Sequence, residues 1–209
     1  MGLKNVEKTI ESYQKALQLN PNHTDAYNNM GMALYDQGRF DEAIESYSKA
    51  VEIEPDFADA YYNLGNALKR VGELEKAIKS YKSSLSIKSD DAEVLNSCGN
   101  ALKDYGEFDQ AVECYAKALE IDPNLAGAQI SIENALKEKL EIESLITDHA
   151  RIANLEIGSA KLIDFTGTIF KAKGYLDAAL DCYNQALRIE PDNVGTHLNL
   201  GIALKNKGD

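Results

Sequence analysis

The sequence predicts an all-α protein built from repeated pairs of helices, and three observations carry that prediction. The four prolines, at positions 21, 55, 123 and 191, lie 34 or 68 residues apart. Most of the 14 glycines follow the same 34-residue spacing. Between these marks, apolar residues recur every three or four positions, which is the spacing of one helix face. A period of this length indicates a repeat architecture made of helix–turn–helix units.

The glycines form two series. We expect the first, the crossing position, to let the two helices of a pair approach closely, because glycine has no side chain. We expect the second, the turn position, to end the first helix of each pair. The crossing position holds Gly31, Gly65, Gly99, Gly167 and Gly201, with Glu133 in the gap. The turn position holds Gly38, Gly72, Gly106, Gly174 and Gly208, with Leu140 in the gap.

The first complete pair shows how each element is justified. Apolar residues at Tyr27, Met30 and Leu34 mark a first helix, and the stretch from Phe40 to Ile53 resumes the pattern after Gly38. Pro55 ends the second helix, since the residue before a proline avoids helical geometry. A tyrosine recurs on each second helix, at Tyr47, Tyr81, Tyr115 and Tyr183, where we expect it to stack on the next repeat.

Applied along the chain, the pattern predicts one solenoid over residues 1–209 with about 12 helices. We expect a lone second helix at 6–20, regular repeats at 24–57, 58–91, 92–125 and 160–193, a degenerate repeat at 126–159, and a lone first helix at 194–209.

The order of the recurring residues in each unit resembles the signature of the tetratricopeptide repeat (TPR). In the first unit this order is Tyr27, Gly31, Leu34, Gly38, Ala43, Tyr47, Ala50 and Pro55. The resemblance implies a right-handed α-solenoid with a concave groove lined mainly by first helices. Proteins similar to this usually bind peptides or partner proteins and are rarely catalytic.

Residues 126–159 keep the 34-residue length but lose nearly every residue of the pattern. Glu133 and Leu140 replace the two glycines, Leu145 a small alanine, His149 the tyrosine and Ile157 the proline. Two outcomes are consistent with this composition: a splayed hairpin, or one long helix that joins two arms. We favour the hairpin, because the downstream repeats keep their register, and we expect the solenoid to be irregular here.

Composition excludes several functions. The net charge of −12 argues against nucleic acid or an anionic membrane as the main partner. No apolar run is long enough to span a bilayer, and three cysteines do not suggest a disulfide framework, so we expect a cytoplasmic protein. No spacing typical of a nucleophile, a phosphate loop or a metal site is present. We therefore expect no catalytic residues, no metal and no cofactor.

Polar residues on the first helices are the candidate binding site. A carboxamide both donates and accepts hydrogen bonds, so a row of asparagines suits an extended peptide backbone. Two lysines near the ends of first helices are candidates for touching an acidic ligand, although a lysine there also favours the helix C-terminus. The predicted residues are Asn28, Asn29, Tyr62, Asn63, Asn66, Asn96, Asn100, Asn134, Lys69 and Lys103.

Two subfamilies provide comparisons for this groove. It resembles the TPR arms of O-linked N-acetylglucosamine transferases, which carry a ladder of asparagines along the groove. In this sequence Asn29, Asn63 and Asn199 match the ladder, whereas Ser97, Ser131 and Phe165 depart from it. Chaperone-binding TPR domains grip a C-terminal carboxylate with basic residues. Here those places hold Asn28, Met32, Glu93 and Ser97, so that clamp is not expected.

The leading functional hypothesis is a non-catalytic scaffold or adaptor that binds an extended peptide or partner protein in the groove. An alternative is the substrate-recruiting arm of a larger transferase, which requires an enzyme domain beyond Asp209. A third is a self-assembling structural element.

Self-assembly is the hypothesis that the ends of the sequence suggest. The chain opens with a second helix that lacks its first helix and closes with a first helix that lacks its second helix. Two molecules stacked end to end would therefore complete one repeat. Exchange of residues 126–159 between chains is a second route to a homo-oligomer. Light-scattering mass measured over two decades of concentration tests both routes: growth of the mass supports assembly, and a constant mass of one chain contradicts it.

Overall fold

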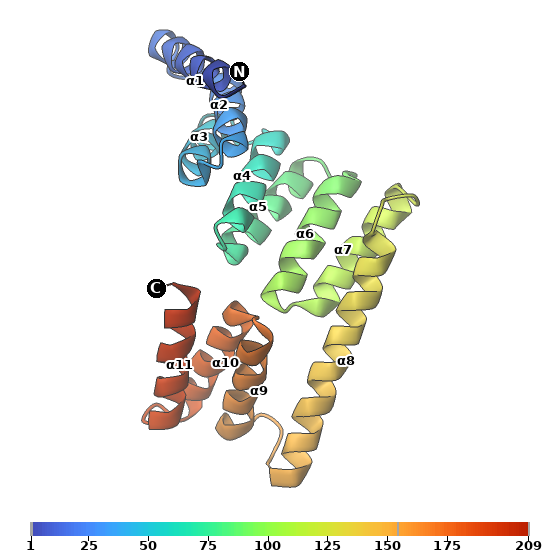
Figure 1. Ribbon diagram of the computed structural model, residues 1–209. Coiled ribbons are helices and arrows are strands. Elements are labelled where there is room, and N and C mark those ends of the chain that lie inside the picture. The colour runs from blue at the N-terminus through green and yellow to red at the C-terminus, as the bar shows by residue number, and fades with distance from the viewer. Residues whose placement is uncertain (1, 154, 209) are drawn as a thin grey trace. The chain divides into compact units, whose positions relative to one another are not determined.

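The computed structural model describes residues 2–153 and 155–208, and those residues form eleven α-helices without a strand (Figure 1). The predicted all-α fold is therefore confirmed. The helices are α1 (Gly2–Leu19), α2 (Thr24–Asp36), α3 (Phe40–Ile53), α4 (Ala58–Arg70), α5 (Leu74–Ile87), α6 (Ala92–Tyr105), α7 (Phe108–Ile121), α8 (Ala128–Ala153), α9 (Ala160–Lys173), α10 (Leu176–Ile189) and α11 (Val194–Lys207).

The chain divides into two compact units. The first consists of Met1–Ala101 and Lys117–Leu125, and the second of Leu102–Ala116 and Ala126–Asp209. In the first unit α2 pairs with α3 and α4 with α5, and α3 also packs on α4. In the second unit α9 pairs with α10, α10 packs on α11, and α8 contacts α9.

Three regular pairs, α2 with α3, α4 with α5, and α9 with α10, are closed by a tyrosine ring that lies directly on the backbone of a glycine. A Cβ atom built on Gly31 would lie 2.6 Å from the Tyr47 ring, and one on Gly65 would lie 2.6 Å from the Tyr81 ring. Gly167 has the same relation to Tyr183, at 2.8 Å. The crossing glycines are therefore required by the close approach of a ring. The sequence predicts stacking of the recurring tyrosines on the next repeat, whereas the contact found for Tyr47, Tyr81 and Tyr183 is with the glycine of their own pair.

The same tyrosines form the centre of the core. Tyr47, Tyr81, Tyr115 and Tyr183 are the largest fully buried side chains of the described residues, at 0–2% exposure. Buried aromatic side chains contribute most of the apolar area in such cores. The alanines one turn earlier, Ala43, Ala77, Ala111 and Ala179, are also fully buried, as their small size suggested.

The turn glycines all have positive φ angles. Gly38, Gly72, Gly106, Gly174 and Gly208 lie between 74° and 101°, in the left-handed region that a residue with a side chain rarely adopts. Each first helix can therefore end in a tight turn at this place, and the second helix begins two residues later.

The hairpin favoured for residues 126–159 is wrong. The structure has one continuous helix, α8, of 26 residues, so the described chain has eleven helices where about 12 were expected. Leu140 occupies the turn position, where a left-handed backbone would be strained. Glu133 occupies the crossing position, where its side chain would meet the aromatic group of a second helix. The preserved downstream register misled the prediction, because α9 starts from its own cap, the Ser159 side chain that accepts from the Leu162 amide.

The long helix packs through a narrow apolar stripe. Its fully buried residues are Ala128, Ala135 and Ile142, seven positions apart. Within the second unit, Ala135 and Ile142 share a cluster with Ile169 of α9, and His149 stacks on Phe165 with ring centroids 3.4 Å apart. His149, which stands at the tyrosine position of the repeat, thus packs on α9 and not on a crossing glycine.

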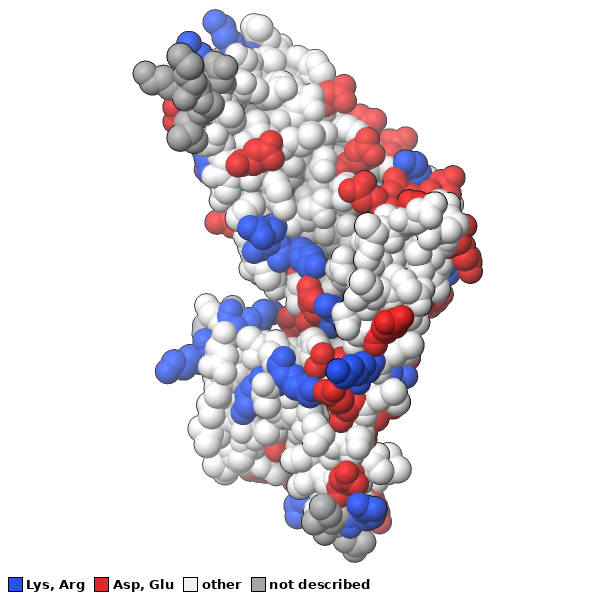
Figure 2. All heavy atoms as spheres, turned by 45° about the vertical axis from the view of Figure 1, so that its right-hand side comes forward, with Lys and Arg blue, Asp and Glu red and all other residues white. Residues whose placement is uncertain are grey.

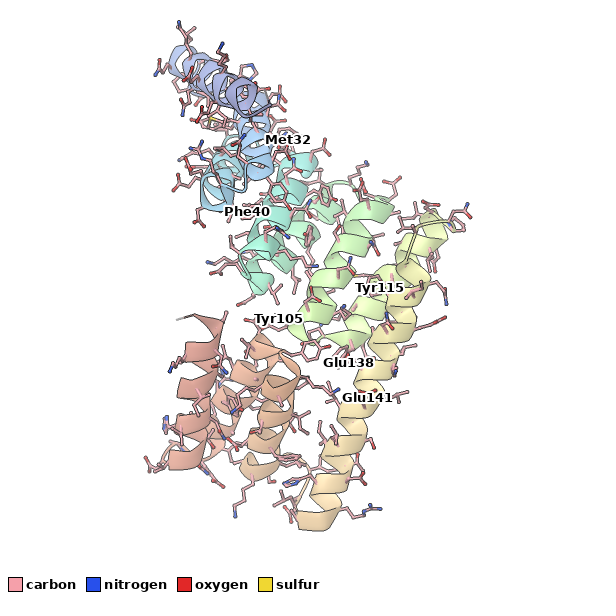
Figure 3. The ribbon with its side chains drawn as sticks, in the orientation of Figure 1. Met32, Phe40, Tyr105, Tyr115, Glu138 and Glu141 are labelled. Carbon is pink, nitrogen blue, oxygen red and sulfur yellow. The ribbon has the colours of Figure 1, made fainter. Side chains whose placement is uncertain are left out.

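Ion pairs fix the same helix to its neighbours in the second unit. Glu138 and Glu141 point from α8 toward the α9 side (Figure 3), and Lys173 pairs with both, at 3.1 Å and 2.9 Å. The Lys173 ammonium lowers the pKa of Glu141, and the hydrogen bonds to Glu141 and Glu138 raise the pKa of Lys173. On the other side, Lys139 pairs with Asp109 at 2.6 Å.

We predict that Gly65→Ala lowers the stability of the protein, since the new methyl group would overlap the buried Tyr81 ring. Overpacking of this kind costs about 1–3 kcal/mol. Gly201→Ala is the matched control: it lies at the same position of α11, but nothing lies within 4 Å of its Cβ position. Urea unfolding followed by circular dichroism should show a lower midpoint for Gly65→Ala alone. Equal midpoints for the two variants would contradict the ring-on-glycine account.

Candidate functional site

The predicted binding residues lie on first helices, most of them in the first unit. Asn28 and Asn29 are on α2, and Asn96 and Asn100 are on α6 before residue 102. Tyr62, Asn63, Asn66 and Lys69 are on α4. We call the seven asparagine and tyrosine residues among these the first-helix surface. Asn134 on α8 and Lys103 at the end of α6 belong to the second unit.

Part of the first-helix surface is used to join neighbouring first helices. The Asn63 amide donates to the Asn28 carboxamide oxygen at 3.0 Å, although the residues are 35 positions apart. Asn28 is buried, with 7% exposure. In the second unit, Asn199 donates to both carboxylate oxygens of Asp164 at 3.3 Å, with the same separation in sequence. The bond between these two positions therefore recurs, and it holds consecutive first helices side by side.

Tyr62 and Asn66 form a second polar group on α4. The Tyr81 hydroxyl donates to Asn66 at 2.7 Å, and the Tyr62 hydroxyl donates to Glu93 of α6 at 3.1 Å. Burial is the largest influence on Tyr62 and raises its pKa, while hydrogen bonds with Asn66 and Ser97 act in the opposite direction. Tyr62 is therefore a neutral hydrogen-bonding group at physiological pH.

Two asparagines keep polar atoms that these internal bonds do not use. Asn29 is exposed on α2, next to the buried Asn28. The carboxamide oxygen of Asn96 is the one buried side-chain oxygen or nitrogen in the described part of the chain that has no hydrogen-bond partner. Asn96 stands at the position of Asn28, whose oxygen accepts from the next first helix. Buried polar groups are normally satisfied, so an acceptor without a partner is costly and favours an incoming donor.

Lys69, Lys103 and Lys171 lie at multiples of the 34-residue spacing near the ends of first helices and form a lysine series, most of which is engaged within the protein. Lys103 lies 3.5 Å from the Asp104 carboxylate. Lys171 donates to Asn199 at 3.5 Å and lies 5.7 Å from the centre of the Tyr183 ring. Lys69 is half-buried on α4. These contacts support the helix-end role of the series more than a role in ligand binding.

The face drawn in Figure 2 carries charges of both signs. In that view carboxylates gather at the upper right, whereas most lysine and arginine side chains lie in the middle and lower part, with carboxylates among them.

Nucleophilic and metal-binding groups are sparse among the described residues. No three histidine, cysteine or carboxylate side chains there are placed to hold a metal ion, and no helix there could cross a membrane. None of the three cysteines forms a disulfide. Burial, helped by the nearby Asp181 carboxylate, raises the pKa of the Cys182 thiol to about 11, which keeps it protonated and unreactive at neutral pH.

Comparison with protein families identifies the repeats. A TPR repeat model matches residues 3–38, 31–72 and 167–208, and a tetratricopeptide repeat model matches residues 58–91 and 92–125. The unmatched residues between them, 126–166, contain the whole of α8. Among curated proteins, the comparison finds no match.

Several solved structures share the fold at low sequence identity. MamA is 24% identical over 89% of each chain, with a TM-score of 0.54. YrrB, described as a TPR protein with an unusual peptide-binding site, is 21% identical over 94% of this chain and 99% of its own, with a TM-score of 0.57. The first TPR domain of Spaghetti (RPAP3), bound to an HSP90 peptide, is 20% identical over 56% of this chain and 93% of its own, with a TM-score of 0.55.

We predict that Asn28 and Asn63 stabilise the first unit as a coupled pair. A hydrogen bond of this kind contributes about 0.5–1.5 kcal/mol net. A double-mutant cycle of Asn28→Ala and Asn63→Ala, measured by urea unfolding, should give a coupling of that size. Additive effects of the two substitutions would show that the bond does not join the helices in solution.

Proposed function

Because the chain belongs to the tetratricopeptide repeat family, whose members commonly mediate protein interactions and are rarely catalytic, we propose that it is a scaffold that binds an extended segment of a partner protein along the first-helix surface. The observation that carries this proposal is the row of carboxamides on consecutive first helices. Asn29 is exposed, and the Asn96 oxygen lacks an internal partner.

The chemistry of the row suits a peptide backbone. A carboxamide offers an acceptor oxygen and two donor hydrogens, and an extended backbone offers alternating N–H and C=O groups. Contacts of this type depend little on the side chains of the peptide. The internal bonds at Asn28, Asn63 and Asn66 fix the orientation of the neighbouring side chains, so less conformational entropy is lost on binding.

Two of the similar structures are described with peptides, which supports a peptide as the class of ligand. YrrB is described as having an unusual peptide-binding site, and the RPAP3 domain is bound to the HSP90 peptide SRMEEVD. For this chain we do not expect an acidic C-terminal tail, because Asn28, Met32, Glu93 and Ser97 stand where a carboxylate clamp needs lysine or arginine.

The test begins with a partner. A photo-crosslinking amino acid at position 29 captures proteins that lie over the first-helix surface, and the same amino acid at the exposed position 206 of α11 defines the background. A partner captured only at position 29 is then purified, and its dissociation constant is measured by calorimetry.

We predict that Asn66→Ala combined with Asn100→Ala weakens the captured partner about 30-fold, since two lost hydrogen bonds cost about 2 kcal/mol. Tyr81→Phe is the matched control, because it removes the internal bond to Asn66 and leaves the amide in place. Asn206→Ala should have no effect. Unchanged affinity in the double variant, or an equal loss in Tyr81→Phe, would contradict binding along this surface.

A further inference from the structure

The second unit contains a pocket of about 220 Å³ where the turn before α7 meets α8 and α9. Its apolar lining comes from three elements: Phe108 of α7, Ile142 and Ile146 of α8, and Phe170 of α9. The charged residues around it are Glu107, Asp109, Lys139 and Glu143. None of these residues belongs to the first-helix surface.

The pocket is a consequence of the continuous α8. A regular fourth repeat would turn at position 140 and place a second helix against the first. Because α8 continues instead, its second half lies along α9, and Ile142 and Ile146 pack with Phe165 and Ile169. The junction is therefore lined by side chains that a regular repeat would cover with its own second helix.

The walls are well fixed. Phe108 and Ile142 are buried, and Phe108 meets Tyr175 edge to face with ring centroids 5.4 Å apart. Lys139 joins the two sides of the rim, since it lies 2.6 Å from Asp109 of α7 and 3.7 Å from Glu143 of α8. Thr166 also lines the pocket, but its hydroxyl donates to the Leu162 carbonyl at 2.8 Å. The Thr166 hydroxyl is therefore already engaged as a hydrogen-bond donor, and the pocket interior offers mainly apolar contact.

Size and charge select the occupant. Small-molecule sites usually have volumes of about 300–1,000 Å³, and this pocket is smaller, near the size needed for one large side chain. The rim has three carboxylates against one ammonium group, a net charge of −2, and Asp109 and Glu143 have side-chain exposures of 76% and 56%. The entrance is therefore acidic and accessible, whereas the floor is apolar.

We propose that this pocket is a second docking site, which takes a leucine- or phenylalanine-sized side chain of a partner peptide that carries lysine or arginine on either side. The apolar side chain enters between Phe108, Ile146 and Phe170, and the flanking basic groups pair with Glu107 and Glu143. A buried apolar anchor within a charged rim is the usual arrangement of a peptide-binding hot spot. This proposal does not depend on the first-helix surface.

Three synthetic peptides test it: GKKFKKG, GKKAKKG and GEEFEEG, each labelled with fluorescein and titrated with the full chain. We expect GKKFKKG to bind at least ten times more tightly than either of the others, because only it supplies both the anchor and the positive charge. Amide NMR shifts on binding should centre on residues 142–146 and 166–170. Equal affinity of GKKFKKG and GKKAKKG would overturn the proposal, since it would mean charge attraction alone.

Protein variants locate the site. Thr166→Phe places a ring inside the pocket and should weaken GKKFKKG at least tenfold, whereas Thr147→Phe, on the exposed side of α8, should not. Glu107→Gln with Glu143→Gln should weaken binding and reduce its salt dependence, and Glu156→Gln is the exposed control. If Thr166→Phe does not fold, as judged by its NMR spectrum, the variant with Glu107→Gln and Glu143→Gln provides the test: unchanged binding in that variant would overturn the proposal.

The two proposed sites are separable. The variant with Asn66→Ala and Asn100→Ala should bind GKKFKKG with wild-type affinity, because those residues lie in the first unit. A loss of GKKFKKG binding in that variant would overturn the assignment of this peptide to the α7–α8–α9 pocket. Wild-type binding there, together with loss in Thr166→Phe, would support the pocket whatever the outcome at the first-helix surface.

Discussion

The packing of a tyrosine ring on a glycine backbone is the contact on which three helix pairs of this protein depend: α2 with α3, α4 with α5, and α9 with α10. At Gly31, Gly65 and Gly167 even one added carbon would lie within 2.8 Å of the ring, so the contact leaves no room for any other residue. Because the ring comes from the second helix, this one contact fixes where the two helices cross. It also buries the largest side chains of the core, so the shape and the stability of each pair have the same origin.

Where this contact is lost, the chain changes its architecture and gains surface features. Glu133 and His149 replace the glycine and the tyrosine of the fourth repeat, and α8 continues without a turn. His149 then stacks on Phe165, and ion pairs through Lys139 and Lys173 tie α8 to α7 and α9. The pocket that we propose as a second docking site is lined by that same junction. A local loss of the repeat pattern thus accounts for the most irregular part of the protein.

The sequence predicted the repeats well because their information is local. A turn glycine needs only its own backbone geometry, and a first helix needs only its apolar spacing, so both are readable from single positions. The fourth repeat was misjudged because equal length does not require an equal path: one helix and a hairpin use the same number of residues. The candidate asparagines lie on first helices as expected, except Asn134, which is on the continuous α8, but their bonds to one another were not predicted. The bond between Asn28 and Asn63 depends on the offset between neighbouring helices, which a single sequence does not reveal.

The continuity of α8 is the central structural claim, and a distance measurement tests it most directly. Glu133 and Thr147 are both exposed and lie seven residues on either side of Leu140. Spin labels at these two positions, in a chain whose three cysteines are replaced by alanine, report their separation by pulsed electron resonance. A continuous helix predicts about 21 Å, from 14 residues at a rise of about 1.5 Å each. A separation of about 10 Å, the spacing of packed antiparallel helices, would mean that the chain turns at Leu140 and would contradict the account.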